Sequence, residues 1–237
     1  MTTPKVHTER IDDVVVVHLD DGKANALSFE VIAAIGDAVA AAESDDSVVA
    51  VVLHGREGRF SAGFDLGVMR GDDITAIVSL VSDGGDLVLQ LYGSSVPVVA
   101  ACTGHALAAG ALLLLGCDLR IGADVDCKIG LNEVAIGLVL PNWALTIAGE
   151  RLSRRHLQRA VATAVVTDAR GARDAGFLDE VVPGPELLDT AIERARAFAS
   201  LDRRAYAGTV TALRGAALAT MRCQIDDDRS SGSAPTS

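Results

Sequence analysis

Short runs of β-branched residues alternate along the chain with segments whose apolar residues recur at helical spacing. Residues 14–19 and 48–53 are apolar runs that predict two buried strands. Ser28 is a candidate N-cap between them. The apolar residues that follow it at helical spacing are Val31, Ile32, Ile35, Val39 and Ala42. Short strands are also expected at residues 97–101, 118–121 and 127–129. Such alternation predicts an α/β fold with largely parallel strands.

The segments between the predicted strands favour loops and helices. Residues 55–63 are expected to form a loop, and helical spacing begins near Ile74. The pattern pauses at Gly84 and Gly85, and residues 106–115 predict a very apolar helix.

The second half of the chain becomes mainly helical from Asn142 onward. Residues 226–237 read DDDRSSGSAPTS, an acidic and then Ser-rich sequence that predicts a disordered tail. We therefore expect a core of residues 1–184, a helical region of residues 185–225, and this tail.

Composition narrows the possible partners. The 237 residues are 49% hydrophobic and 22% charged, as in a folded soluble protein. The net charge is −11, which argues against a nucleic-acid partner because phosphate binding needs a basic face. Residues 1–10 lack the apolar core of a signal peptide, and the apolar stretch at 96–115 is interrupted by Pro97 and Gly104. We expect a cytoplasmic protein without a membrane span.

The four cysteines are Cys102, Cys117, Cys127 and Cys223. None lies in a C-x-x-C pair or at zinc-finger spacing, so no metal site is expected. Cys102 and Cys117 lie in apolar surroundings, which favours buried reduced thiols in a reducing compartment.

Three segments are candidates for chemistry, and each has an ordinary structural alternative. SAGFDL at 61–66 could expose backbone amides, or it could be a simple loop. GHALAAG at 104–110 could begin a helix whose N–H groups hold an oxyanion, or it could be close-packed core. Glu133, the only ionisable residue from 129 to 149, could be a buried general base or a solvent-facing residue at a helix start.

Two other polar residues are weaker candidates. Ser61 is not in a G-x-S-x-G elbow and has no assignable His and Asp partners. His105 stands alone beside a glycine, where a structural role is the commoner one.

Taken together, the motifs resemble those of the enoyl-CoA hydratase/isomerase, or crotonase, superfamily. The matching segments, in order, are KANAL at 23–27, SAGFDL at 61–66, PVVAACTGHALAAG at 97–110, CDLR at 117–120, GLNE at 130–133, and DARGARDAGFLDEVV at 168–182. The resemblance extends from about residue 10 to about residue 215.

This resemblance implies a spiral of ββα turns with a C-terminal helical trimerisation region, assembled as a homotrimer or hexamer. It implies an acyl-CoA substrate, no further cofactor, and an oxyanion hole made by the backbone N–H groups of Phe64 and Ala109. The residues implied to bind coenzyme A or the substrate are Lys23, Ala24, Ala26, Ala62, Asp65, Leu66, Leu112 and Trp143. For Trp143, ordinary core packing is an equal alternative.

One departure from the family pattern bears on the reaction. Hydratases of this family place a Glu where this chain has Leu112, and water addition uses two carboxylates. Leu112 together with GLNE and the later PNW resembles the Δ3,Δ2-enoyl-CoA isomerases, which implies double-bond migration with Glu133 as the single base. The alternatives are a 2-enoyl-CoA hydratase, another one-carboxylate reaction, and a non-catalytic acyl-CoA-binding protein.

Overall fold

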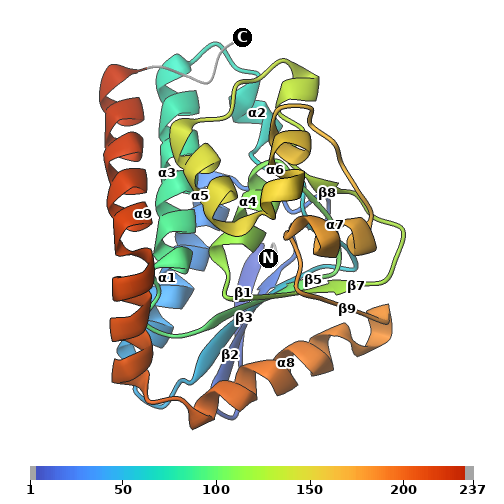
Figure 1. Ribbon diagram of the computed structural model, residues 1–237, viewed down its shortest axis with the longest axis vertical. Coiled ribbons are helices and arrows are strands. Elements are labelled where there is room, and N and C mark those ends of the chain that lie inside the picture. The colour runs from blue at the N-terminus through green and yellow to red at the C-terminus, as the bar shows by residue number, and fades with distance from the viewer. Residues whose placement is uncertain (1–3, 233–237) are drawn as a thin grey trace.

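The computed structural model describes residues 4–232, which form two β-sheets surrounded by helices (Figure 1). Within these residues the larger sheet has six strands, in the spatial order β1 (Val6–Ile11), β2 (Val14–Leu19), β3 (Ala50–Gly55), β5 (Val98–Cys102), β7 (Leu119–Ala123) and β9 (Glu180–Val182). The smaller sheet follows the order β4 (Gly58–Ser61), β6 (Gly104–Leu107) and β8 (Ile129–Gly130). β1 and β2 are antiparallel, and the other neighbouring pairs are parallel. The predicted α/β fold with largely parallel strands is confirmed.

A unit of two strands and a helix recurs through the core. β3, β5 and β7 lie in the larger sheet, and the strand that follows each of them, β4, β6 or β8, lies in the smaller one. These pairs lead into α3 (Ile74–Tyr92), α4 (Ala109–Gly116) and α5 (Asn142–Arg151). The short helix α2 (Leu66–Met69) precedes α3, and the 3-10 turn η1 (Val134–Ile136) precedes α5. This is the ββα spiral that the resemblance implied.

The remaining helices are α1 (Phe29–Ser44), α6 (Arg154–Val161), α7 (Ala169–Ala175), α8 (Leu187–Ala197) and α9 (Arg203–Ser231), with 3-10 turns η2 (Gly184–Glu186) and η3 (Phe198–Ser200). α8 lies across one face of the larger sheet, and α1, α3, α4 and α5 lie on the other side (Figure 1). α9 runs along α3 and contacts α5.

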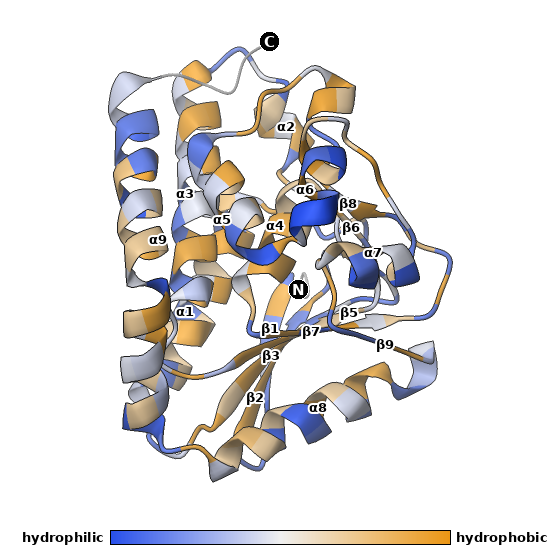
Figure 2. Ribbon diagram, in the orientation of Figure 1, coloured by the Kyte–Doolittle hydropathy of each residue, from blue (hydrophilic) through white to orange (hydrophobic). Residues whose placement is uncertain are grey.

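Apolar side chains from alternate positions of the strands fill a core on each side of the larger sheet. Val17 and Leu53 face the helices of the spiral, while Val16 and Val52 face α8. α4 is buried along its whole length and is apolar on all sides (Figure 2). The helices of the spiral therefore pack around α4, which places its N-terminus inside the protein.

α3 is the one helix within residues 4–232 that could cross a membrane by length and hydropathy alone. Half of its most apolar window is buried inside the protein, as is usual for a core helix.

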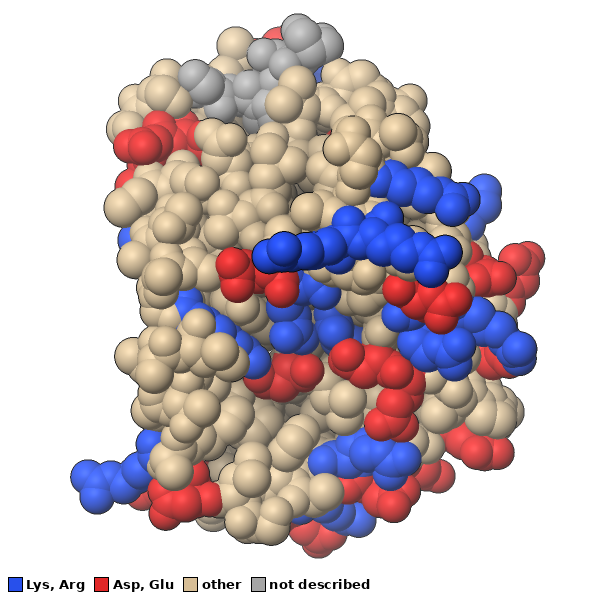
Figure 3. Space-filling model, viewed as in Figure 1, with Lys and Arg blue, Asp and Glu red and all other residues tan. Residues whose placement is uncertain are grey.

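Charged side chains on the face seen in Figure 3 gather over α6, α7 and α8.

The strand predictions agree with the structure to within one or two residues for β2, β3, β5 and β7. Ser28 caps α1 by accepting a hydrogen bond from Val31 N–H, and the predicted apolar residues of α1 are buried. The loop predicted at residues 55–63 was wrong, because these residues include the strand β4. The very apolar helix predicted at residues 106–115 is α4, but its predicted start was wrong because residues 106 and 107 belong to the strand β6. β4 and β6 are too short for an alternation of apolar and polar residues to be recognised in the sequence. They form because parallel partner strands are available in the smaller sheet.

The predicted pause at Gly84 and Gly85 was also wrong, because α3 is continuous through both residues. A Cβ at Gly84 would lie 2.3 Å from the Phe64 ring, and one at Gly85 would lie 2.9 Å from the Trp143 indole. The two glycines therefore make room for aromatic rings from other segments, and tertiary packing compensates for their low helix propensity.

The prediction of a disordered tail was wrong for its first residues. Residues 226–231 continue α9 as helix, and residues 233–237 lie outside the described residues. Arg229 bridges back to Asp83 and Asp86 on α3, at 3.2 and 2.6 Å. Such pairs between helices cannot be recognised from the local composition of the tail.

Replacing Gly110 by Ala should destabilise the fold, because its Cβ would lie 2.3 Å from the backbone oxygen of Ser61 on β4. We expect a loss of about 1–3 kcal/mol in the free energy of unfolding, measured by denaturant titration. Gly149→Ala is the matched control, since a Cβ there meets nothing within 4 Å on α5. It should be neutral or stabilising by up to about 1 kcal/mol. Equal stability of the two variants would contradict the close contact.

Candidate functional site

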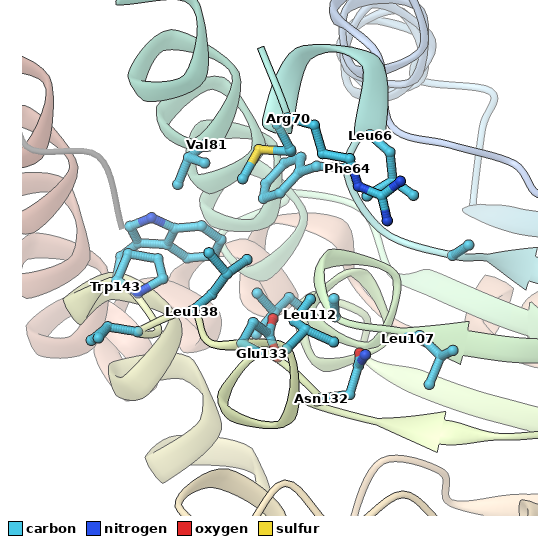
Figure 4. Close-up of a pocket in the computed structure, with 16 residues that line it drawn as sticks. Phe64, Leu66, Arg70, Val81, Leu107, Leu112, Asn132, Glu133, Leu138 and Trp143 are labelled. Carbon is cyan, nitrogen blue, oxygen red and sulfur yellow. The ribbon is translucent and has the colours of Figure 1, made fainter. Parts of the chain in front are cut away.

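A pocket of about 240 Å³ opens between α2, the start of α4, and the segment from Asn132 to Trp143. Figure 4 shows Glu133 and Leu112 near its centre, Val81, Leu138 and Trp143 on one side, and Leu66 and Arg70 on the other. The full set of lining residues is Ala62, Phe64, Leu66, Met69, Arg70, Val81, Leu107, Ala108, Leu112, Asn132, Glu133, Ile136, Leu138, Val139, Pro141 and Trp143. Most of this lining is apolar, so a bound group loses contact with water.

The SAGFDL segment turns sharply after β4. Gly63 has φ +93°, a conformation that glycine adopts without strain. Leu27 N–H donates to Gly63 O, and Asp65 N–H donates to Leu27 O. This pairing skips Phe64, whose N–H has no hydrogen-bond acceptor within residues 4–232.

The GHALAAG segment turns at Ala108, just before α4. Ala108 has φ +50° and ψ −125°, a conformation that strains a residue with a Cβ by about 1–3 kcal/mol. Its N–H donates to Gly130 O, and its carbonyl accepts from Leu112 N–H in the first turn of α4. The N–H of Ala109, the first residue of α4, has no acceptor within the described chain.

The two free amides belong to neighbouring segments. A Cβ at Gly63 would lie 3.3 Å from Ala109 N, so the residue before Phe64 lies against the start of α4. Unpaired N–H groups at a helix start carry partial positive charge and can hold a developing oxyanion. The arrangement has the donors that an oxyanion hole requires.

Glu133 is the carboxylic acid of the pocket. Glu133 is only 9% exposed, and its buried Oε2 atom has no hydrogen-bond partner within residues 4–232. Burial raises the pKa of Glu133 to about 7, although a hydrogen bond from its own backbone N–H acts in the opposite direction. It precedes η1, whose turn is closed by Ile136 N–H donating to Glu133 O. Because the side chain is buried, the alternative that Glu133 faces solvent is wrong. A carboxylic acid with this pKa can accept and return a proton near neutral pH.

Leu112 and Trp143 form parts of the apolar wall. Leu112 is 2% exposed on α4, and Trp143 is fully buried at the start of α5. Trp143 lines the pocket and also packs against Gly85 in the core, and its role in substrate binding stays a prediction.

The other predicted residues occupy two kinds of position. Ala62 lines the pocket, and its N–H donates to Ala24 O, which brings the 23–26 segment alongside. Lys23, Ala24 and Ala26 do not line the pocket themselves. Asp65 also lies outside the lining, and its carboxylate caps α2 by accepting from Gly67 N–H at 2.7 Å. The binding roles of these four residues stay predictions.

Sequence reasoning missed two polar lining residues, Arg70 and Asn132. Asn132 is adjacent to Glu133 in GLNE, and its buried Oδ1 atom has no hydrogen-bond partner within the described residues. The GLNE motif could therefore have indicated Asn132 as a site residue. Arg70 follows α2 with no distinctive neighbours, so its position depends on the tertiary structure.

The remaining candidates have structural surroundings. His105 Nδ1 accepts a hydrogen bond from Lys128 N–H at 2.9 Å. Cys102, Cys117 and Cys127 are buried, all four cysteines are free, and burial raises the pKa of the Cys102 thiol to about 12. Residues 4–232 contain no cluster of three or more metal-ligating side chains.

The family model for enoyl-CoA hydratase/isomerase matches residues 9–231. The chain belongs to the enoyl-CoA hydratase/isomerase family. This family, the crotonase superfamily, is the one that the sequence motifs resembled, and its members include isomerase-like relatives of this chain.

Relatives of this chain carry the names of two activities, enoyl-CoA isomerase and enoyl-CoA hydratase. It is 30% identical to human "Enoyl-CoA delta isomerase 1, mitochondrial" over 91% of this chain. The chain spans 62%, 72% and 60% of the lengths of the mouse, human and rat proteins of that name. It is also 34% identical, over 77% of this chain and 71% of the relative, to a "Probable enoyl-CoA hydratase" from Mycobacterium avium.

Solved structures of similar proteins have the same fold as this chain. The human mitochondrial delta3-delta2-enoyl-CoA isomerase superposes with TM-score 0.91 at 29% identity, over 96% of this chain and 90% of that one. One Mycobacterium tuberculosis protein, 37% identical, has TM-scores of 0.90 and 0.91 in two structures. These cover 96% of this chain and 98% and 95% of the solved chains. Its structures carry the names enoyl-CoA isomerase and probable enoyl-CoA hydratase, so family names alone do not decide the reaction.

Burial of Glu133 should make the stability of this crotonase depend on pH. The pKa of Glu133 in the folded state, about 7, is above its ordinary value of 4.5, so the folded state binds more protons between these pH values. The stabilisation is complete below pH 4.5 and is lost as pH rises through about 7, by roughly 3 kcal/mol. Glu133→Gln removes this titration. Denaturant unfolding from pH 4 to 9 should show the variant gaining stability over the wild type in that window, whereas parallel curves would contradict the raised pKa.

Proposed function

We propose that this family member is a Δ3,Δ2-enoyl-CoA isomerase of fatty acid metabolism, acting on acyl-CoA thioesters. The observation that supports this best is Glu133, the one carboxylic acid among the described residues that line an apolar pocket. Within the described residues, the N–H groups of Phe64, in the same lining, and of Ala109, next to the lining residue Ala108, have no acceptor. Moving a double bond by one carbon needs one base and one oxyanion hole, and these groups are the candidates for both roles.

In the proposed reaction the thioester oxygen accepts hydrogen bonds from the N–H groups of Phe64 and Ala109. The Glu133 carboxylate takes a proton from C2, and the C–H electron pair moves into a dienolate whose negative charge lies on that oxygen. Glu133 then returns the proton to C4, so the double bond moves from C3–C4 to C2–C3. Each amide donor typically contributes about 3 kcal/mol of transition-state stabilisation, and a positioned base contributes roughly 10²–10⁴-fold in rate.

Leu112 favours isomerisation over hydration in this proposal. Adding water across a double bond needs groups that orient the water, take one proton and give another. Glu133 is the only carboxylic acid among the described lining residues. The apolar Leu112 side chain excludes water from the intermediate and, by desolvation, keeps Glu133 basic.

The hydratase alternative is supported by relatives with that name. It would need a second carboxylic acid from outside the lining of this pocket. A non-catalytic acyl-CoA-binding protein is the second alternative, and it would bind the thioester without converting it.

Replacing Glu133 by Gln should lower kcat for 3-enoyl-CoA isomerisation by about 10²–10⁴-fold, because the amide keeps the shape but cannot accept a proton. Binding of a saturated acyl-CoA should be largely retained. The matched control is Glu150→Gln, an exposed Glu on α5 outside the pocket, which should behave as wild type. Product formation is followed chromatographically. Activity of Glu133→Gln within a few-fold of the wild type would rule out this base.

Replacing Leu112 by Glu should introduce weak hydration of 2-enoyl-CoA, because it places a second carboxylic acid in the pocket beside Glu133. Burying this second carboxylic acid will lower the stability of the fold. The two acids will share protons, so the rate of isomerisation should fall. Leu112→Gln is the control of equal size that lacks the acid. Formation of 3-hydroxyacyl-CoA is compared among the three proteins. Robust hydration by the wild type would contradict the role given to Leu112.

A further inference from the structure

Exposed apolar side chains are concentrated in and next to the two chain segments that line the pocket. Of the ten large apolar residues that are well exposed within residues 4–232, six lie in the segments 66–74 and 134–145. Three of these six also line the pocket: Leu66 is 54% exposed, Ile136 57% and Val139 60%. Exposed apolar patches of this kind usually mark binding surfaces.

The pocket itself is small for an acyl-CoA. Its volume of about 240 Å³ lies below the roughly 300–1,000 Å³ of pockets that enclose a drug-sized ligand. With the thioester held near Phe64 and Glu133, a long acyl chain must extend beyond the enclosed volume.

The two sides of the pocket differ in polarity. Arg70 lies on one side, while Val81, Leu138 and Trp143 line the other (Figure 4). An acyl chain is apolar, so it would follow the second side. Val139 adjoins Leu138 in sequence, lines the pocket and is 60% exposed. The chain would therefore leave the enclosed volume over Val139 and Ile136.

We propose that Ile136 and Val139 form an outer acyl subsite that makes the enzyme prefer decenoyl and dodecenoyl chains over hexenoyl chains. This inference rests on the proposed function in taking acyl-CoA as the ligand. A fully buried methylene contributes up to roughly fourfold in affinity, and one covered on a single side contributes about half of that free energy, or roughly twofold. Two side chains cover about three to four methylenes, so the longer chains should gain about tenfold in total.

Two other occupants would also cover exposed apolar residues: a second copy of this chain and a lipid surface. Neither occupant would distinguish Ile136 and Val139 from Ile74, which is 56% exposed, and Leu145, which is 41% exposed, although these two residues do not line the pocket. The net charge of −11 also opposes binding to anionic lipid. Continuity with the pocket is what favours the acyl chain.

The test compares kcat/KM for 3-hexenoyl-, 3-decenoyl- and 3-dodecenoyl-CoA in the wild type and in the double variant Ile136→Ser/Val139→Ser. The wild type should favour the longer chains by about tenfold, and the double variant should lose at least about fivefold of this preference. The control double variant Ile74→Ser/Leu145→Ser replaces two exposed apolar residues that do not line the pocket, and it should keep the preference.

A second measurement separates this inference from the proposed function. Calorimetric Kd values for saturated hexanoyl- and dodecanoyl-CoA should show the same preference and the same loss, even if no substrate turns over. A flat chain-length profile in the wild type would overturn the outer subsite. Equal loss of the chain-length preference in both double variants would also overturn the outer subsite, because it would indicate a general surface contact. Sedimentation would then test for a second copy of the chain, and vesicle binding would test for a lipid surface.

Discussion

The contact between Gly110 at the start of α4 and the backbone of Ser61 on β4 is the constraint on which the site depends. It brings the small sheet against an apolar helix so closely that a methyl group would collide with a carbonyl oxygen. Only this approach places the Gly63 turn beside Ala109, and with it the two unpaired amides. Amides held by backbone geometry need no reorganisation when charge develops on a bound oxygen, which is the main source of their catalytic value.

The rest of the structure fixes the shape of the pocket around that contact. Gly84 on α3 leaves room for the Phe64 ring, and Gly85 leaves room for the Trp143 indole. α9 supports this arrangement from behind, with Ile225 packed near Gly85 and Arg229 paired with the acids of α3. The C-terminal helix thus stabilises the wall of the pocket without lining it in the described structure.

The site is kept at a cost to stability. Glu133 is buried with no hydrogen-bond partner for its Oε2 atom among the described residues, and Ala108 holds a strained backbone conformation. Both features disfavour folding, and both lie where chemistry would use them. The extensive apolar packing around α4 offsets these costs, since it buries every residue of that helix.

The sequence by itself determined the family, the main strands, the burial pattern of α1 and the segments that carry the chemistry. Those features are local: hydrophobic periodicity, capping by Ser28 and short motifs such as GLNE are readable within a few residues. Tertiary structure decided the rest. The strands β4 and β6, the unbroken α3 and the helical end of α9 each depend on partners far away in the chain. The positions of Arg70 and of the exposed rim at Ile136 and Val139 depend on packing between segments, because a surface is defined by neighbours that the local sequence does not contain.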